Sequence, residues 1–153
     1  MQLLFLLAII LATYALSGLW RGASRSFRGR LALTIFFLFT GLGHFIKTNE
    51  MAQMLPSFVP QRTAIIYATG ILEILGAIGL LIPTLKRITS WALILFLLAV
   101  LPANIYSALH HVDFGGHAFG PVYLLLRIPF QIFVIAWTYY FGIKLSGANF
   151  ASA

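Results

Sequence analysis

The sequence predicts an all-α fold, a polytopic bundle of five transmembrane helices. Of its 153 residues, 61% are hydrophobic and only 8% are charged, whereas a soluble domain carries roughly a quarter charged residues. Five apolar runs, each close to the roughly 20 residues that cross a bilayer, alternate with short polar stretches. We therefore expect residues 1–153 to form a single transmembrane domain, with the lipid bilayer as its surroundings.

Charge and cysteine content exclude several classes of function. The formal net charge is +7, but the basic residues lie between apolar runs, so no basic face free of lipid is left for nucleic acid. The chain has no cysteine, which excludes disulfides, thiolate metal sites, iron–sulfur clusters and cysteine nucleophiles.

The first apolar run extends from Gln2 to Trp20. A cleaved signal peptide is the alternative to a membrane span at this position. No basic residue precedes the run, however, and the strongly basic segment RGASRSFRGR follows it. We expect residues 1–20 to form an extra, uncleaved N-terminal transmembrane helix.

Four further runs follow, and a broken segment separates the first two of them. The segment between Lys47 and Arg62 contains MAQMLPSFVPQR, which is too short and too interrupted by Pro56 and Pro60 to cross a bilayer. We expect Met51–Pro60 to lie at the membrane interface, over the mouth of the bundle. The four runs are Leu31–Ile46, Thr63–Ile82, Ile88–Leu109 and Val122–Phe141.

The basic residues predict the orientation. Five spans place the stretch after the first run, the turn with Lys86 and Arg87, and the tail with Lys144 on one side. The positive-inside rule puts that side in the cytoplasm. The opposite side has Lys47 and Arg62, offset by acidic residues. We expect a multi-pass protein of the cell inner (plasma) membrane, with the N-terminus outside and the C-terminus in the cytoplasm.

Few polar residues interrupt the spans, and these are the candidate ligand-binding residues. A charge in hydrocarbon costs several kcal/mol unless it is paired or hydrated. By helix rise, the depths of Glu73 and Arg127 differ by roughly 7 Å, which an arginine side chain can bridge. We expect a direct or water-bridged pair. A protonated, unpaired Glu73 is the alternative. The candidates are His44, Glu73, Asn104, Arg127 and Gln131.

The same residues allow two interpretations. The pair could simply orient two helices, or it could line a polar cavity open to a ligand. Pro102 and Pro129 each free a backbone carbonyl near these polar residues, which favours a cavity; the alternative is that they are ordinary prolines of membrane helices. Gly70, Glu73, Gly76 and Gly79 recur every three residues, and we expect the three glycines to allow close helix packing.

A histidine cluster follows the fourth run, in the segment HHVDFGGHAFGP. Imidazoles together with a carboxylate can bind zinc, copper or iron. The spacing HHxDxxxH is not a standard ligand spacing, so we expect no metal here and keep these residues as weak candidates. They are His110, His111, Asp113 and His117.

Residues 31–141 resemble the DoxX-like family of four-helix integral membrane proteins. The resemblance depends on the order of GLGHF, MLPSFVP, GILEILGAIGLLIP, AVLPANIYSALH and LLLRIPFQIFVIAW. It implies a four-helix core with the polar residues inward, to which the first helix is an addition. Some relatives are small subunits of membrane redox complexes that pass electrons to quinone. Others accompany oxidative-stress or metal-handling systems, and distant ones assist membrane protein assembly.

Three functional hypotheses follow. The leading one is a small membrane subunit of an oxidoreductase system that binds a quinone or similar lipophilic molecule. Asn104, Arg127, Gln131 and His44 would bind its oxygens, Glu73 would relay a proton, and a redox partner protein would supply electrons. The second is a stand-alone enzyme that uses Glu73 and His44 as catalytic acid and base on a lipophilic small molecule. The third is a non-catalytic assembly or scaffold protein.

Overall fold

A computed structural model describes residues 2–148, and within that range the chain is helical without a strand. Five helices are long and apolar enough to cross a membrane, as the composition predicts. They are α1 (Gln2–Leu16, continued by a 3₁₀ turn, Ser17–Leu19), α2 (Arg25–Ile46), α4 (Arg62–Leu81), α5 (Lys86–Leu109) and α6 (Pro121–Tyr139, continued by a π-helical turn, Tyr140–Lys144). Three short helices complete the described chain: α3 (Thr48–Ala52), a 3₁₀ turn (His117–Phe119) and α7 (Leu145–Ala148).

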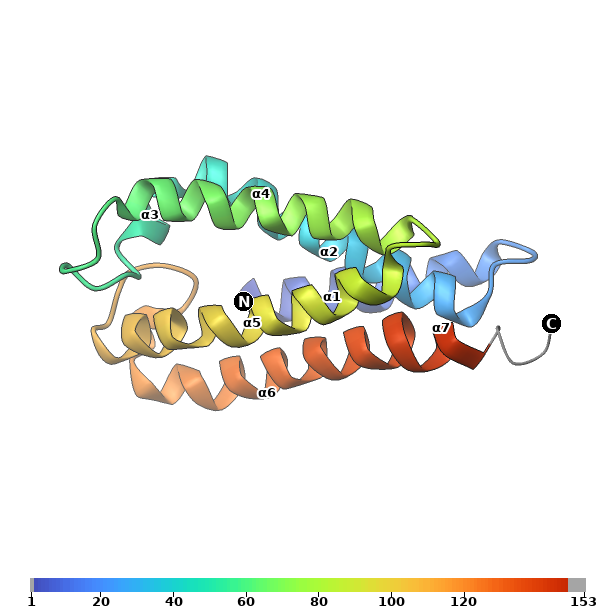
Figure 1. Cartoon of the computed structure of the whole chain (residues 1–153). Helices are drawn as coiled ribbons and strands as arrows, with labels where there is room; N and C mark the ends of the chain where they lie inside the picture. Colours follow the sequence, from blue (N-terminus) through green and yellow to red (C-terminus); the bar gives the residue numbers. More distant parts are fainter. Residues whose placement is uncertain (1, 149–153) are drawn as a thin grey trace.

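The long helices form two neighbouring pairs. Helix α2 packs along α4, and α5 packs along α6, while α4 also contacts α5 (Figure 1). Helix α1 packs against α2 and α6. A single apolar core joins helices of both pairs, because it includes buried side chains of α2, α5 and α6: Phe36, Phe37, Leu93, Leu97, Phe130 and Val134.

Glycines set the distance between α2 and α4. A Cβ atom on Gly70 would lie 2.7 Å from the His44 Cβ and 3.1 Å from the Gly41 carbonyl oxygen. Gly76 and Gly79 face Leu93 and Thr89 of α5 just as closely. The structure thus confirms that the glycines around Glu73 allow close helix packing.

Helix α1 is fixed to the other helices at its C-terminal end. The Arg28 guanidinium donates from Nη2 to the Tyr14 carbonyl oxygen at 3.0 Å and lies 4.6 Å above the Tyr14 ring. The same ring contacts Trp137 and Phe141 at centroid distances of 5.3 Å. A cation at a helix C-terminus is favourable because it faces the unpaired carbonyls there.

Helix α2 begins earlier than its apolar run. It starts at Arg25 rather than Leu31, because Ser24 caps it by accepting a hydrogen bond from the Phe27 backbone N–H at 3.2 Å. Arg25, Arg28 and Arg30 therefore lie on the helix and not in a loop. The segment between α2 and α4 forms only the short α3 and a series of turns, as its prolines predict.

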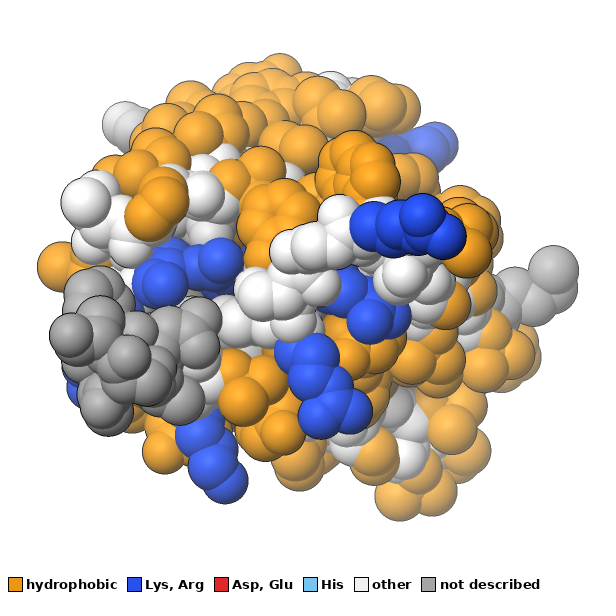
Figure 2. Space-filling model, turned by 90° about the vertical axis from the view of Figure 1, so that its right-hand side faces the viewer, with side chains coloured by type: hydrophobic (Ala, Val, Ile, Leu, Met, Phe, Trp, Pro, Cys, Tyr) orange, Lys and Arg blue, Asp and Glu red, His pale blue; other side chains and the backbone are white. Residues whose placement is uncertain are grey.

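The two ends of the molecule differ in charge. One end has the segment after α3 and the loop between α5 and α6, and Gln2 lies against Gly115 of that loop. The other end has the turns before α2 and α5, together with α7 (Figure 1). Seen from this second end, basic side chains are exposed and no acidic side chain is visible (Figure 2). We call it the basic end, and its basic residues are Arg21, Arg25, Arg28, Arg30, Lys86, Arg87 and Lys144.

Candidate functional site

Glu73 and His44 form one half of the site, between α4 and α2. The close approach of Gly70 and Gly41 brings the two helices together at this level. Glu73 is 8% exposed, and its Oε1 lies 3.6 Å from His44 Nε2. The structure thus joins the two residues that the sequence suggested as an acid–base pair.

The other side of the His44 ring is also fixed. Its Nδ1 lies 3.1 Å from the Ile66 carbonyl oxygen and 3.0 Å from Thr69 Oγ1. A neutral imidazole that donates from Nδ1 to the carbonyl presents a bare Nε2 to Glu73. The ring is thereby oriented with Nε2 toward the Glu73 carboxyl group.

Asn104 and Arg127 form the other half, between α5 and α6. Arg127 donates from Nε and Nη2 to the Asn104 Oδ1 at 3.3 and 3.2 Å. Asn104 donates in turn to the Val100 carbonyl oxygen at 3.0 Å. Gln131, one turn beyond Arg127, donates from Nε2 to the Leu97 carbonyl oxygen across the same helix pair. The side chains of Arg127 and Gln131 thus link α6 with α5, and Asn104 holds Arg127 in place.

The predicted direct ion pair between Glu73 and Arg127 is not formed. The ionic partner of Glu73 among the described residues is His44, and Arg127 binds the amide of Asn104 instead. The helix pairs explain this, because each polar group finds its partner on the adjacent helix. The two charges still interact electrostatically across the bundle, so a water-bridged arrangement stays a prediction.

Two acceptor oxygens in this region have no partner. Glu73 Oε2 and Gln131 Oε1 are both buried and accept no hydrogen bond from the described residues. Glu73 and Gln131 belong to different halves of the site. A buried acceptor without a donor costs about 1–3 kcal/mol, so both oxygens are suited to a ligand or water that carries hydroxyl or N–H groups.

The histidines between α5 and α6 do not form a cluster. Each ring has its Nδ1 within hydrogen-bonding distance of a different carbonyl oxygen. The pairs are His110 with Tyr106 at 2.8 Å, His111 with Ala118 at 3.1 Å and His117 with Phe114 at 2.7 Å. Within residues 2–148 no three His, Asp or Glu side chains are grouped so that they could hold a metal ion. Asp113 lies in the same loop without joining them into such a group.

His117 instead lies in the neighbourhood of Arg127, a position that was not predicted from the sequence. It is 3% exposed, and its ring lies edge-on to Tyr123 at 4.8 Å. Burial lowers the pKa of His117 below its ordinary value, and the positive charge of Arg127 lowers it further. The signal in the sequence was the run of glycines: Gly116 and Gly120 have φ of 104° and 69°, and these turns direct the loop back onto α6.

One family model matches residues 33–142, and its description is "Domain of unknown function (DUF8561)". The chain belongs to this family. The match begins inside α2 and ends in the π-helical turn after α6, so α1 lies outside it. No curated protein and no solved structure matches the chain.

Proposed function

Starting from this family membership and from five helices able to cross a bilayer, we propose that the protein is a small multi-pass subunit of a membrane oxidoreductase system. It binds a quinone or similar lipophilic molecule between the two halves of the polar site. The observation that supports this best is the unpartnered Glu73 Oε2, on a carboxyl group that also contacts His44. The DoxX-like resemblance, with a four-helix core and an added first helix, is part of this proposal.

The donors and acceptors of the site suit such a molecule. A quinone changes its oxygens from acceptors to hydroxyl donors when it is reduced, so both kinds of partner are needed. Arg127 is the donor for a carbonyl oxygen, and Asn104 fixes its position. Glu73 Oε2 accepts from a hydroxyl group, and the His44–Glu73 pair takes up the proton.

Electrons would come from a redox partner protein. The chain has no cysteine for an iron–sulfur cluster, and its polar residues bind and move protons rather than electrons. The contribution of this chain would be to hold the lipophile in the membrane and to provide its proton path.

A scaffold function is the second candidate. The bonds Arg127–Asn104 and Gln131–Leu97 both link α5 with α6, as residues that only orient helices would. This reading leaves Glu73 Oε2 and Gln131 Oε1 without a role. A stand-alone enzyme would use the same His44–Glu73 pair on a lipophilic substrate.

Extraction of the purified protein with organic solvent, followed by mass spectrometry, tests the proposal. The wild-type chain should release a quinone or similar lipophile, and Glu73→Gln should lose most of it because the proton acceptor is gone. Glu50→Gln is the matched control, since Glu50 is half-exposed on α3 and pairs with Lys47 at 3.0 Å. It should retain the lipophile.

The results separate the three functions. Absence of any lipophile from a folded wild-type protein, with full stability of Glu73→Gln, would leave only the scaffold. A bound lipophile that the protein converts without any partner protein would favour the stand-alone enzyme. A bound quinone whose redox state changes only with a second protein present supports the subunit.

A further inference from the structure

The basic end holds seven of the ten Lys and Arg residues and none of the acidic side chains. The three acidic residues lie elsewhere, in α3, in the middle of α4 and in the loop between α5 and α6. No Asp or Glu side chain therefore lies at the basic end. An anion from outside the chain is the natural partner for such a surface.

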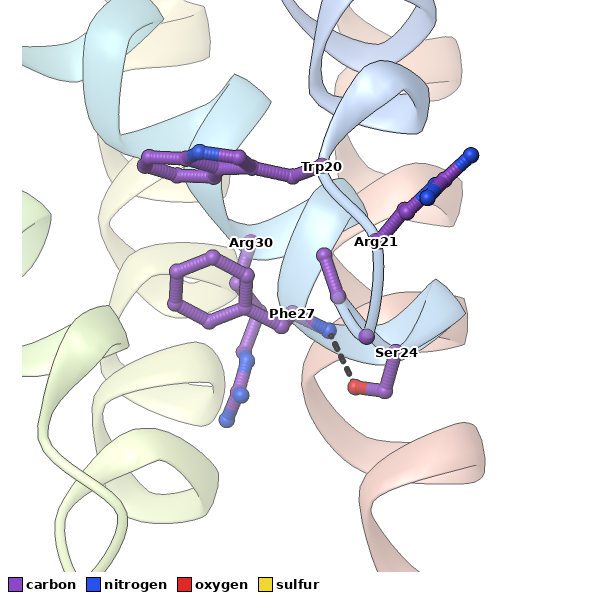
Figure 3. Close-up of a pocket in the computed structure, with 7 residues that line it drawn as sticks. Trp20, Arg21, Ser24, Phe27 and Arg30 are labelled. Atoms are coloured by element: carbon purple, nitrogen blue, oxygen red, sulfur yellow. Dashed lines mark hydrogen bonds between the residues drawn. The ribbon is translucent and has the colours of Figure 1, made fainter.

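An open hollow lies at this end, at the turn that leads from α1 into α2. Trp20, Arg21, Ser24, Phe27 and Arg30 are among the residues that line it. Trp20, Phe27 and Arg30 extend to the same side of the turn, while Arg21 extends to the other (Figure 3). The hollow thus combines a guanidinium group with two aromatic rings.

Among the described residues, Arg30 has the most buried donor nitrogens without a partner. It is 7% exposed, and its buried Nε and Nη1 donate to no acceptor among the residues that the structure describes. The C-terminal ends of α1 and α4 lie at this end too, but neither nitrogen donates to their carbonyls. Lys86 of α5 is close enough for its positive charge to act against that of Arg30. A buried charge of this kind is costly unless an anion meets it.

An apolar groove adjoins the hollow. Leu16, Leu19 and Leu31 line it together with Thr13, and Trp20 borders both depressions. The groove follows α1 and α2 away from the basic end, toward the part of the molecule that the apolar helices place in hydrocarbon. A basic hollow joined to an apolar groove has the polarity of a phospholipid, with a phosphate at one end and an acyl chain at the other.

We propose that the hollow and groove bind an anionic phospholipid of the leaflet that faces the basic end. Arg30 holds the phosphate with charge-assisted hydrogen bonds, Arg21 borders the headgroup, and an acyl chain follows the groove beside Trp20. The site is separate from the polar residues between the helices, so it does not depend on quinone binding.

Native mass spectrometry of the full chain in detergent tests this site. The probes are phosphatidylglycerol and phosphatidylcholine with the same acyl chains, added in increasing amounts. The wild type should bind phosphatidylglycerol more tightly than phosphatidylcholine. Arg30→Gln should weaken that binding about tenfold, since a charge-assisted hydrogen bond is lost. Arg30→Lys, which keeps the charge, should recover part of it.

Arg87→Gln is the matched control, because it removes a charge from the same end at an exposed position that does not line the hollow. Its binding should equal that of the wild type. Trp20→Ala, at a side chain 65% exposed, should fold normally and weaken lipid binding, which keeps the test valid if Arg30→Gln is unstable. Equal losses in Arg30→Gln and Arg87→Gln would overturn the proposal and indicate only a general charge effect.

Inorganic phosphate distinguishes the lipid from a free anion. If millimolar phosphate displaces phosphatidylglycerol and Trp20→Ala has no effect, the hollow is a site for a small anion and the lipid proposal fails. If phosphate does not compete and Trp20→Ala weakens binding, the acyl chain contributes and the proposal stands.

Discussion

Arg127 is a guanidinium group inside a helical bundle whose direct hydrogen-bond partner is a neutral amide. Asn104 accepts two of its hydrogen bonds and in turn donates to the backbone of its own helix. The amide therefore positions the arginine while leaving its charge available to Glu73 and to a ligand. This differs from a closed ion pair, in which the two charges neutralise each other.

A double-mutant cycle should show that Asn104 and Arg127 act together. Asn104→Ala and Arg127→Ala should each lower the free energy of unfolding by about 1–3 kcal/mol, because each leaves a buried partner unpaired. The double variant should cost less than the sum, by about 0.5–3 kcal/mol. Thermal unfolding in detergent measures all four proteins. Strictly additive losses would mean that the two hydrogen bonds contribute nothing to stability.

The site was predictable in its members but not in its pairings. All five candidate residues lie within the helices, and helix rise gives their depth from sequence alone. Depth does not say which helix is the nearest neighbour. Because α2 packs against α4, Glu73 lies next to His44. Because α5 packs against α6, Arg127 lies next to Asn104. The position of His117 near Arg127 was not predicted, because it depends on a loop whose turns follow from glycine backbone angles.

His117 should make stability depend on pH. Burial lowers its pKa in the folded protein below the ordinary value of 6.5, with the charge of Arg127 as a further cause. Below that value the unfolded chain binds the proton first, so the unfolded state gains protons relative to the folded one and stability falls. The full contribution is present above about pH 6.5 and is lost as the pH falls through the folded pKa.

Unfolding temperatures at about pH 8 and about pH 5.5 check this for the wild type and for His117→Gln. The wild type should lose stability between the two conditions, and the variant should lose less because it has no imidazole to protonate. The comparison uses the difference between the two proteins, since His44, His110 and His111 are present in both. An equal loss in the two would contradict a role for His117.

At the scale of helices, Gly70 fixes the contact between α2 and α4. Gly70→Ala should lower the free energy of unfolding by about 1–3 kcal/mol through overpacking, since its Cβ would lie 2.7 Å from His44 Cβ. It should also lengthen the His44–Glu73 contact and weaken lipophile binding. Gly43→Ala on α2 is the matched control, because its nearest neighbour would be Met51 Cε at 3.8 Å. Thermal unfolding measures the stability of both variants, and equal losses in Gly70→Ala and Gly43→Ala would contradict the packing argument.

The helices themselves were predictable to within a few residues, with one exception. Four of the five runs correspond closely to α1, α4, α5 and α6, because an apolar run of this length has few alternatives to a helix. The start of α2 was placed at Leu31 because the basic segment RGASRSFRGR precedes it. Ser24 as a cap places the start at Arg25, and hydropathy does not register caps.

At the scale of the whole molecule, the charges are sorted by end. The basic end holds seven cationic residues, and the end with the loop between α5 and α6 has Lys47 and Arg62 together with Glu50 and Asp113. Any helical bundle needs polar ends, but a soluble bundle has no reason to concentrate positively charged side chains at one end. This asymmetry is typical of membrane insertion, in which cationic loops stay in the cytoplasm.

Reporter fusions test the orientation and the number of spans together. A reporter fused after Ala153 should be active on the cytoplasmic side, and one inserted at Gly115 should be active on the outside. Helix α6 lies between the two reporter sites in the chain. The residues of the basic end lie at the same end of α6 as Lys144. Replacing Arg21, Arg25 and Arg28 by Gln should weaken the preference, because fewer positive charges then oppose translocation. A cytoplasmic reporter at Gly115 would refute the orientation, and reporters on the same side would refute a crossing by α6. Only the expected pattern places the lipid hollow on the cytoplasmic leaflet and the His44–Glu73 pair nearer the outside.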